Sequence, residues 1–164
     1  IGDFRDMLSY IHDETVKGMN EGRDVHTLMR DVRVPDRYEI RPWFGKVEWT
    51  VRGIFHEYAG WFDENPASMY GEPATGIYQD LAELAGTDAI LSRAKGYVDS
   101  GEAVKALHLT DVVLGADPSN AGANEVRLGA LRALRAGTNN YIERIWLDYG
   151  IRSCEDRLRP GQGE

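Results

Sequence analysis

The sequence predicts an all-α fold, a helical bundle with tetratricopeptide-like helical hairpins in its C-terminal half. Apolar residues recur at spacings of three and four along most of the chain, and Gly, Pro, Asp and Asn divide it into segments of helical length. No run of alternating residues as long as a strand stands out. With 164 residues, 42% of them hydrophobic, the chain is long enough for one domain with its own core. We therefore expect a single helical domain over residues 1–164.

Two helices are predicted within residues 1–33. Gly22 stops the first of them, and Asp24 can cap a shorter second helix that ends before Pro35. The first helix carries its apolar stripe at Phe4, Met7, Leu8, Ile11, Thr15 and Met19. From Val34 to Lys46 the order is irregular, and we expect an ordered loop held down by its apolar and aromatic residues. These are Tyr38, Ile40, Trp43 and Phe44.

A third helix is predicted over residues 47–63. Its apolar positions recur at helical spacing, and Asp63, Asn65 and Pro66 supply turn chemistry at its end. Because this helix is apolar over much of its circumference, we expect Trp61 to be buried. A turn-rich connector follows, with too many breakers for regular structure.

Residues 76–150 are predicted to form antiparallel helical hairpins. One hairpin has the spacing of a 34-residue tetratricopeptide repeat, with small, aromatic, small and proline positions at Ala94, Tyr97, Ala106 and Pro118. The next unit keeps the helical period but loses the motif, so a long solenoid is not expected. Residues 151–164 turn polar and end in Pro-Gly-Gln-Gly-Glu, which predicts a tail or linker.

Composition excludes several classes of protein. Nineteen basic against 27 acidic residues give a formal charge of −8, which disfavours a nucleic acid or an anionic membrane as a partner. No apolar run is long enough to span a bilayer, so we expect a soluble domain. The lone Cys154 has no second cysteine to pair with and is expected to be a partly buried thiol. The chain begins at Ile1 without a signal-peptide pattern, and we expect it to be part of a longer polypeptide.

No autonomous catalytic centre is visible in the sequence. His56-Glu57 begins the zinc-protease helix motif, but position 60 is Gly where the second histidine is needed. His12 and Asp13 are consecutive, point about 100° apart on a helix and cannot alone converge on one metal ion. We therefore predict no metal site in this chain.

Residues 58–66, Tyr-Ala-Gly-Trp-Phe-Asp-Glu-Asn-Pro, resemble a signature of the dimerisation domain of alkyl sulfatases, which are metallo-β-lactamase-type enzymes. His12, Asp13 and Thr15 fit the same family, and the resemblance runs from about residue 5 to about residue 158. We call residues 58–66 the signature segment. Its structural positions are Gly60, Trp61, Asp63, Asn65 and Pro66.

The resemblance implies an assembly domain that forms a homodimer and joins a metallo-β-lactamase-like domain of the same polypeptide. In such enzymes zinc is bound by a His-x-His-x-Asp-His motif, which this chain lacks, so the zinc is expected in the missing catalytic domain. Carried over by position, Tyr58 would border the sulfate site, with Arg52 a second candidate for contact with the anion. The family usually has Gly where this chain has Glu64, which bears on the geometry of the turn.

A second function remains open from the residues alone. The hairpin pattern is also typical of tetratricopeptide-like modules that bind a peptide or protein in a concave helical groove. Such modules usually stack at least three repeats, whereas this chain offers one clear copy. A stand-alone enzyme ranks third, because the sequence displays no convergent polar site.

Overall fold

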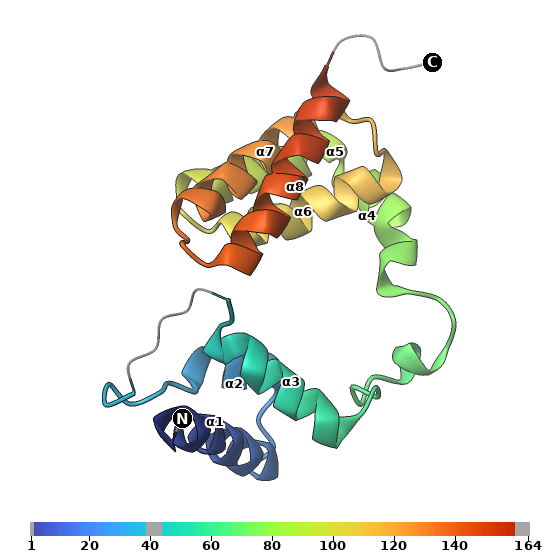
Figure 1. Ribbon diagram of the computed structural model, residues 1–164. Helices are drawn as coiled ribbons and strands as arrows, with labels where there is room; N and C mark the ends of the chain where they lie inside the picture. The colour runs from blue at the N-terminus through green and yellow to red at the C-terminus, as the bar shows by residue number, and fades with distance from the viewer. Residues whose placement is uncertain (1, 39–43, 160–164) are drawn as a thin grey trace. The chain divides into compact units, whose positions relative to one another are not determined.

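The chain folds entirely into helices in the residues that the computed structural model describes, 2–38 and 44–159 (Figure 1). Eight α-helices and two short 3-10 helices account for all regular structure in these residues, and none of them lies in a strand. The all-α prediction is confirmed. The chain divides into two compact units, residues 1–71 and residues 72–164, and each is described by itself. The expectation that residues 1–164 act as one domain stays a prediction.

Unit 1 is built from three helices, α1 (Gly2–Asn20), α2 (Val25–Asp31) and α3 (Val47–Ala59), followed by the 3-10 helix η1 (Pro66–Met69). Its core consists of buried apolar side chains that the three α-helices and the end of α2 contribute: Ile11, Leu28, Val32 and Val51. A Cβ atom on Gly18 would lie 2.3 Å from a methyl carbon of Leu28, so α1 and α2 approach each other closely at this point.

Asp24 begins α2 as the sequence predicts. Its Oδ1 accepts hydrogen bonds of 3.0 Å from the backbone N–H groups of His26 and Thr27, two donors that lack partners within the helix. The hydroxyl of Thr27 donates to Oδ2 at 2.6 Å. These bonds lower the pKa of Asp24, the Thr27 hydroxyl contributing most.

The predicted aromatic loop falls only partly within the described residues. Tyr38 packs against Tyr10 of α1, with ring centroids 6.5 Å apart, whereas Phe44 is exposed. Ile40 and Trp43 lie outside the described residues, as does the end of the predicted tail, residues 160–164. None of the helices in the described parts of the chain is both long and apolar enough to cross a membrane.

The described part of unit 2 consists of one 3-10 helix and five α-helices that pack on one another (Figure 1). The 3-10 helix η2 (Ala74–Ile77) leads into α4 (Tyr78–Ala85), α5 (Thr87–Asp99), α6 (Ala103–Ala116), α7 (Ala121–Ala136) and α8 (Tyr141–Leu158). From α5 onward each helix packs against the next, and α4 packs against α6. Short connections between consecutive helices make neighbouring helices antiparallel.

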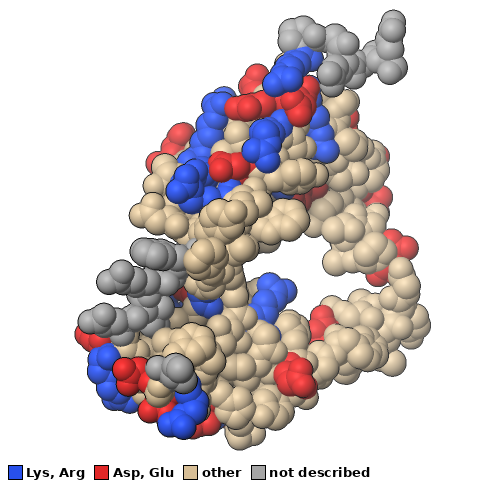
Figure 2. All heavy atoms as spheres, in the orientation of Figure 1, with Lys and Arg blue, Asp and Glu red and all other residues tan. Residues whose placement is uncertain are grey.

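The last helix is longer than the sequence predicts. The expected tail began at residue 151, but α8 continues to Leu158. Polar composition misled the prediction: this part of α8 is charged on its exposed side while Cys154 on the other side is buried. Figure 2 shows the charged side chains crowded over the C-terminal part of α8, with mostly uncharged surface over its N-terminal part.

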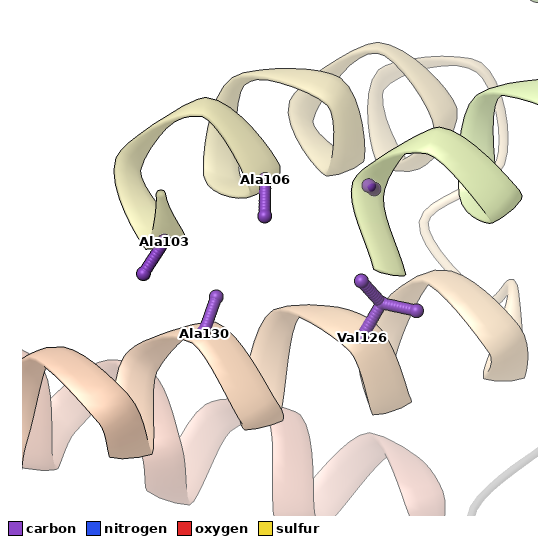
Figure 3. Packing of buried hydrophobic residues seen from close by; sticks show 5 residues of the cluster. Ala103, Ala106, Val126 and Ala130 are labelled. Carbon is purple, nitrogen blue, oxygen red and sulfur yellow. The ribbon is translucent and has the colours of Figure 1, made fainter. Parts of the chain in front are cut away.

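Small residues let α5, α6 and α7 pack closely. Ala103 and Ala106 of α6 face Ala130 and Val126 of α7 (Figure 3), and Ala94 of α5 is fully buried in the same cluster. Tyr97 packs against this cluster from the side. Two small positions of the predicted repeat thus lie in close contact between helices, but the assignment to the tetratricopeptide class stays a prediction.

Candidate functional site

Tyr58 lies at the surface of unit 1, in the last turn of α3, with 60% of the residue exposed. Its hydroxyl oxygen is 2.8 Å from Nε2 of His12 on α1, and the two rings lie 5.7 Å apart. This position is not that of a core aromatic. Its role in binding a substrate stays a prediction.

The second ring nitrogen of His12 contacts the neighbouring residue, Asp13. Nδ1 lies 3.0 Å from Oδ1 of Asp13. A carboxylate only accepts hydrogen bonds, so Nδ1 is the donor to Asp13, and Nε2 and the Tyr58 hydroxyl share the second hydrogen bond. This contact was not predicted, because 46 residues separate the two rings and no local spacing relates them.

Arg52 does not share a helix face with Tyr58. Its side chain is exposed on α3, six residues before Tyr58. At about 100° per residue, six residues place the two Cα–Cβ directions about 120° apart around the helix. The structure therefore keeps both candidates at the surface of one helix but does not bring them together on one side.

The signature segment contains the last two residues of α3 and, from Gly60 to Pro66, a hydrogen-bonded turn. Gly60 adopts a left-handed φ of 72° and its N–H closes the helix on His56, so α3 ends at Ala59 and the predicted end at residue 63 is wrong. Asp63 then accepts from the N–H of Asn65 at 3.1 Å and from the hydroxyl of Ser68 at 3.0 Å. The Asn65 bond, first, and the Ser68 bond lower the pKa of Asp63.

Two more features fix this turn. Asn65 caps η1 by accepting from the N–H of Ala67, and Pro66 is the first residue of that helix. Glu64 has a φ of 64°, which a glycine adopts freely and which other residues adopt rarely. At the position where the resemblance implies Gly, this chain thus keeps a backbone conformation that glycine favours.

Trp61 is exposed, and the prediction that it is buried is wrong. The residue is 76% exposed and its ring lies edge-on to Phe62, with centroids 5.5 Å apart. Because α3 ends at Ala59, Trp61 does not continue the buried stripe of the helix. Trp61 and Phe62 instead line a hollow of about 380 Å³ together with Met19, Val25 and Phe55. An aromatic residue at a mostly apolar hollow is typical of a contact surface.

A second exposed apolar surface lies in unit 2 and was missed at the level of sequence. Ile142, Ile145, Trp146 and Tyr149 are exposed on α8 although they keep the helical period expected of a core helix. Their spacing of three, four and seven residues shows that they share a face, but spacing alone cannot tell which face of a helix meets the core.

Within residues 2–38 and 44–159, no group of three or more His, Cys, Asp and Glu side chains is placed to hold a metal ion. His56 and Glu57 are exposed near the end of α3. Cys154 is buried, and burial raises the pKa of its thiol. These described residues therefore do not fit a zinc centre.

The fold and its surfaces define a helical domain with exposed aromatic contact surfaces, and comparison with known proteins identifies its family. The family model described as alkyl sulfatase dimerisation matches residues 27–155. The chain therefore belongs to the alkyl sulfatase dimerisation family, and the resemblance of the signature segment is confirmed.

The relatives are alkyl sulfatases. Alkyl/aryl-sulfatase BDS1 of Saccharomyces cerevisiae is 30% identical over 135 residues, which cover 79% of this chain and 21% of the relative. The (R)-specific secondary-alkylsulfatase of a Pseudomonas species is 26% identical over 176 residues, which cover 99% of this chain and 26% of the relative. The chain thus spans only about a quarter or less of these relatives.

A solved structure shares the fold. The stereoselective inverting sec-alkylsulfatase Pisa1 from Pseudomonas matches with a TM-score of 0.84 at 24% identity, covering 97% of this chain and 26% of that chain.

Proposed function

We propose that this chain is the assembly domain of a longer alkyl-sulfatase-type hydrolase, in which it pairs two copies of the polypeptide. The observation that carries the proposal is the match to the alkyl sulfatase dimerisation family over residues 27–155. The chain spans only about a quarter or less of each relative, which supports the proposal that catalysis is carried out by parts of the polypeptide outside this domain.

Zinc belongs, in this proposal, to a metallo-β-lactamase-like domain of the same polypeptide. The described residues of this chain supply no cluster of ligands for it. A zinc centre that hydrolyses an ester needs about three protein ligands and an open position for water or substrate, and those must come from elsewhere. The assembly domain alone is therefore expected to be inactive toward sulfate esters.

Tyr58 is the residue of this domain that we propose to contact the sulfate ester in the longer polypeptide. Its hydroxyl is exposed and its direction is fixed by His12, so little rotational freedom remains to be lost on binding. With Nε2 of His12 as the donor in their contact, the phenol keeps its own hydrogen to donate to a sulfate oxygen. Arg52 is the second candidate, and its position on another side of α3 suits it to a different part of the anion or to the neighbouring domain.

The exposed aromatic surface of the signature segment is proposed to face the catalytic domain. Trp61 precedes a turn in which the hydroxyl of Ser68 donates a hydrogen bond to Asp63, and the tryptophan is exposed. An exposed aromatic ring beside a mostly apolar hollow provides a contact anchor.

The test compares this chain with the longer polypeptide. We expect both to sediment as dimers, only the longer polypeptide to contain zinc, and only it to hydrolyse dodecyl sulfate. In the longer polypeptide, Tyr58→Phe is expected to lower turnover by about ten- to a hundredfold, because a hydrogen bond to a charged group contributes about 1.5–3 kcal/mol. Tyr70→Phe is the matched control, an exposed tyrosine after η1. A monomeric chain, or zinc bound tightly by this chain, would contradict the proposal.

A further inference from the structure

The outer side of α8 carries four exposed apolar residues on one stripe, which we call the α8 face: Ile142, Ile145, Trp146 and Tyr149. Trp146 is 65% exposed, and its ring meets that of Tyr149 edge-on with centroids 6.0 Å apart. Gly150, one turn after Trp146, lies at the edge of the stripe, where its Cβ would lie 3.1 Å from Leu131 of α7, and the buried Cys154 marks the side of α8 that faces the core. The stripe therefore points away from the core of unit 2.

Within the described residues α8 packs on α7, and the apolar stripe on its outer side is exposed. Exposed Trp and Tyr side chains at such a position are typical of anchors in protein interfaces.

A hollow of about 710 Å³ lies directly beside the α8 face. Leu114 of α6 and Leu131 of α7 line its apolar part, and Trp146 and Tyr149 line its α8 side. Arg127 and Arg157 add polar lining. Projecting rings and a hollow able to receive side chains of that size thus occur on one continuous surface.

We infer that the α8 face and this hollow form the surface on which a second copy of this chain docks. A two-fold interface uses the same patch on both partners, so a patch that contains both a projecting ring and a hollow is complementary to itself. The matched range of the dimerisation family, residues 27–155, includes the whole α8 face. The inference rests on the proposed function, and it adds which surface performs the pairing.

Charge and area are consistent with this partner. Two copies with a formal charge of −8 each repel one another overall, so the mostly uncharged surface over the N-terminal part of α8 (Figure 2) favours pairing there, and in the hollow Arg127 is paired with Asp111. The four side chains expose on the order of 400 Å² per copy, judged from the size of aromatic and branched side chains. Two copies therefore bury about 800 Å² before the walls of the hollow are counted, and the hollow brings the total toward the 1,200 Å² at which specific interfaces begin.

The first experiment measures self-association of the chain by sedimentation over a range of concentrations. Trp146→Glu places a charge at the centre of the α8 face, and each dimer receives two such charges. It is expected to raise the dissociation constant by at least about tenfold. Leu84→Glu is the matched control, because Leu84 is 85% exposed on α4 and lies outside the α8 face. Circular dichroism should show that both variants keep their helix content.

A second experiment tests contact between copies directly. Ser153→Cys places a thiol at the hollow, where the buried native Cys154 does not compete for a maleimide reagent. A short bis-maleimide is expected to join two Ser153→Cys chains and not two Leu84→Cys chains.

The outcomes separate this inference from the proposed function. A dimer that Trp146→Glu leaves intact and that Ser153→Cys does not cross-link overturns the α8 face as the interface, while the assembly function stands. A wild-type chain that stays monomeric up to about 100 μM, where even weak specific pairs associate, overturns both.

Discussion

A methyl group added at Gly115 tests how closely α4 packs on α6. A Cβ atom at this position would lie 2.5 Å from Cδ2 and 3.2 Å from Cβ of Tyr78. Because the Tyr78 Cβ is itself in the way, rotation of the ring alone cannot relieve the contact. Overpacking of this kind costs about 1–3 kcal/mol.

Gly96→Ala in α5 is the matched control. No atom lies within 4 Å of a Cβ built on Gly96, so the methyl group enters open space in the interior of a helix. Alanine favours the helix over glycine by about 1 kcal/mol, and the control is expected to gain up to that amount. Gly115→Ala gains no more stability from helix propensity than Gly96→Ala does, because Gly115 is next to the last residue of α6. The two variants should therefore differ by the overpacking cost, about 1–3 kcal/mol.

The assay is thermal unfolding followed by circular dichroism or calorimetry. For a unit of this size about 1 kcal/mol shifts the melting temperature by roughly 4–8 °C, so Gly96→Ala should melt about 4–24 °C above Gly115→Ala. Repeating both variants in a Tyr78→Ala background should reduce the difference, since the 2.5 Å contact with the ring is then absent and only the 3.2 Å contact with Cβ remains. Equal melting temperatures for the two variants in the wild-type background would refute the close contact between α4 and α6.

Trp61→Ala is expected to change the free energy of unfolding by no more than about 0.5 kcal/mol, because the residue is 76% exposed; a loss of several kcal/mol in a denaturant titration would show that the ring is buried. The lowered pKa of Asp24, due first to the Thr27 hydroxyl, means that its ionised form stabilises the fold above about pH 3.8 and that this contribution is lost as the pH falls through the lowered value. Asp24→Asn keeps the capping oxygen without the charge, so its free energy of unfolding relative to that of the wild type should rise as the pH falls below about 3.8. If the stabilities of the two proteins fell in parallel on acidification, the effect would be excluded. Cys154 should react with iodoacetamide at least about a hundredfold more slowly in the folded chain than in urea, because burial shields the thiol and raises its pKa, and equal rates would argue against its burial.

Helix positions were predictable where a short segment determines them. The cap at Asp24 and the Gly60 to Pro66 turn chemistry are local, because a side chain bonds a backbone group two or three residues away. The end of α3 was placed too late, because Trp61 and Phe62 continue the apolar composition beyond the point where Gly60 has already reversed the backbone. Composition alone does not reveal a left-handed φ.

The candidate site was predictable in its residues but not in its arrangement. The signature segment pointed to Tyr58 and Arg52, and the structure places both on the surface of α3. The hydrogen bond between Tyr58 and His12 depends on how α1 packs beside α3, which no spacing within either helix specifies. The exposure of Trp146 on α8 depends in the same way on which side of the helix meets α7.

By itself the sequence determined the all-α class, the family and the absence of a zinc-binding motif, because helical period, turn residues and metal-ligand spacing are properties of short segments. Only the tertiary structure decided which apolar residues are covered. The same spacing places Val51 of α3 in a core and Trp146 of α8 at the surface, since burial depends on neighbours that are distant along the chain. For this protein that distinction matters, because the exposed aromatic residues are the ones on which its proposed contacts depend.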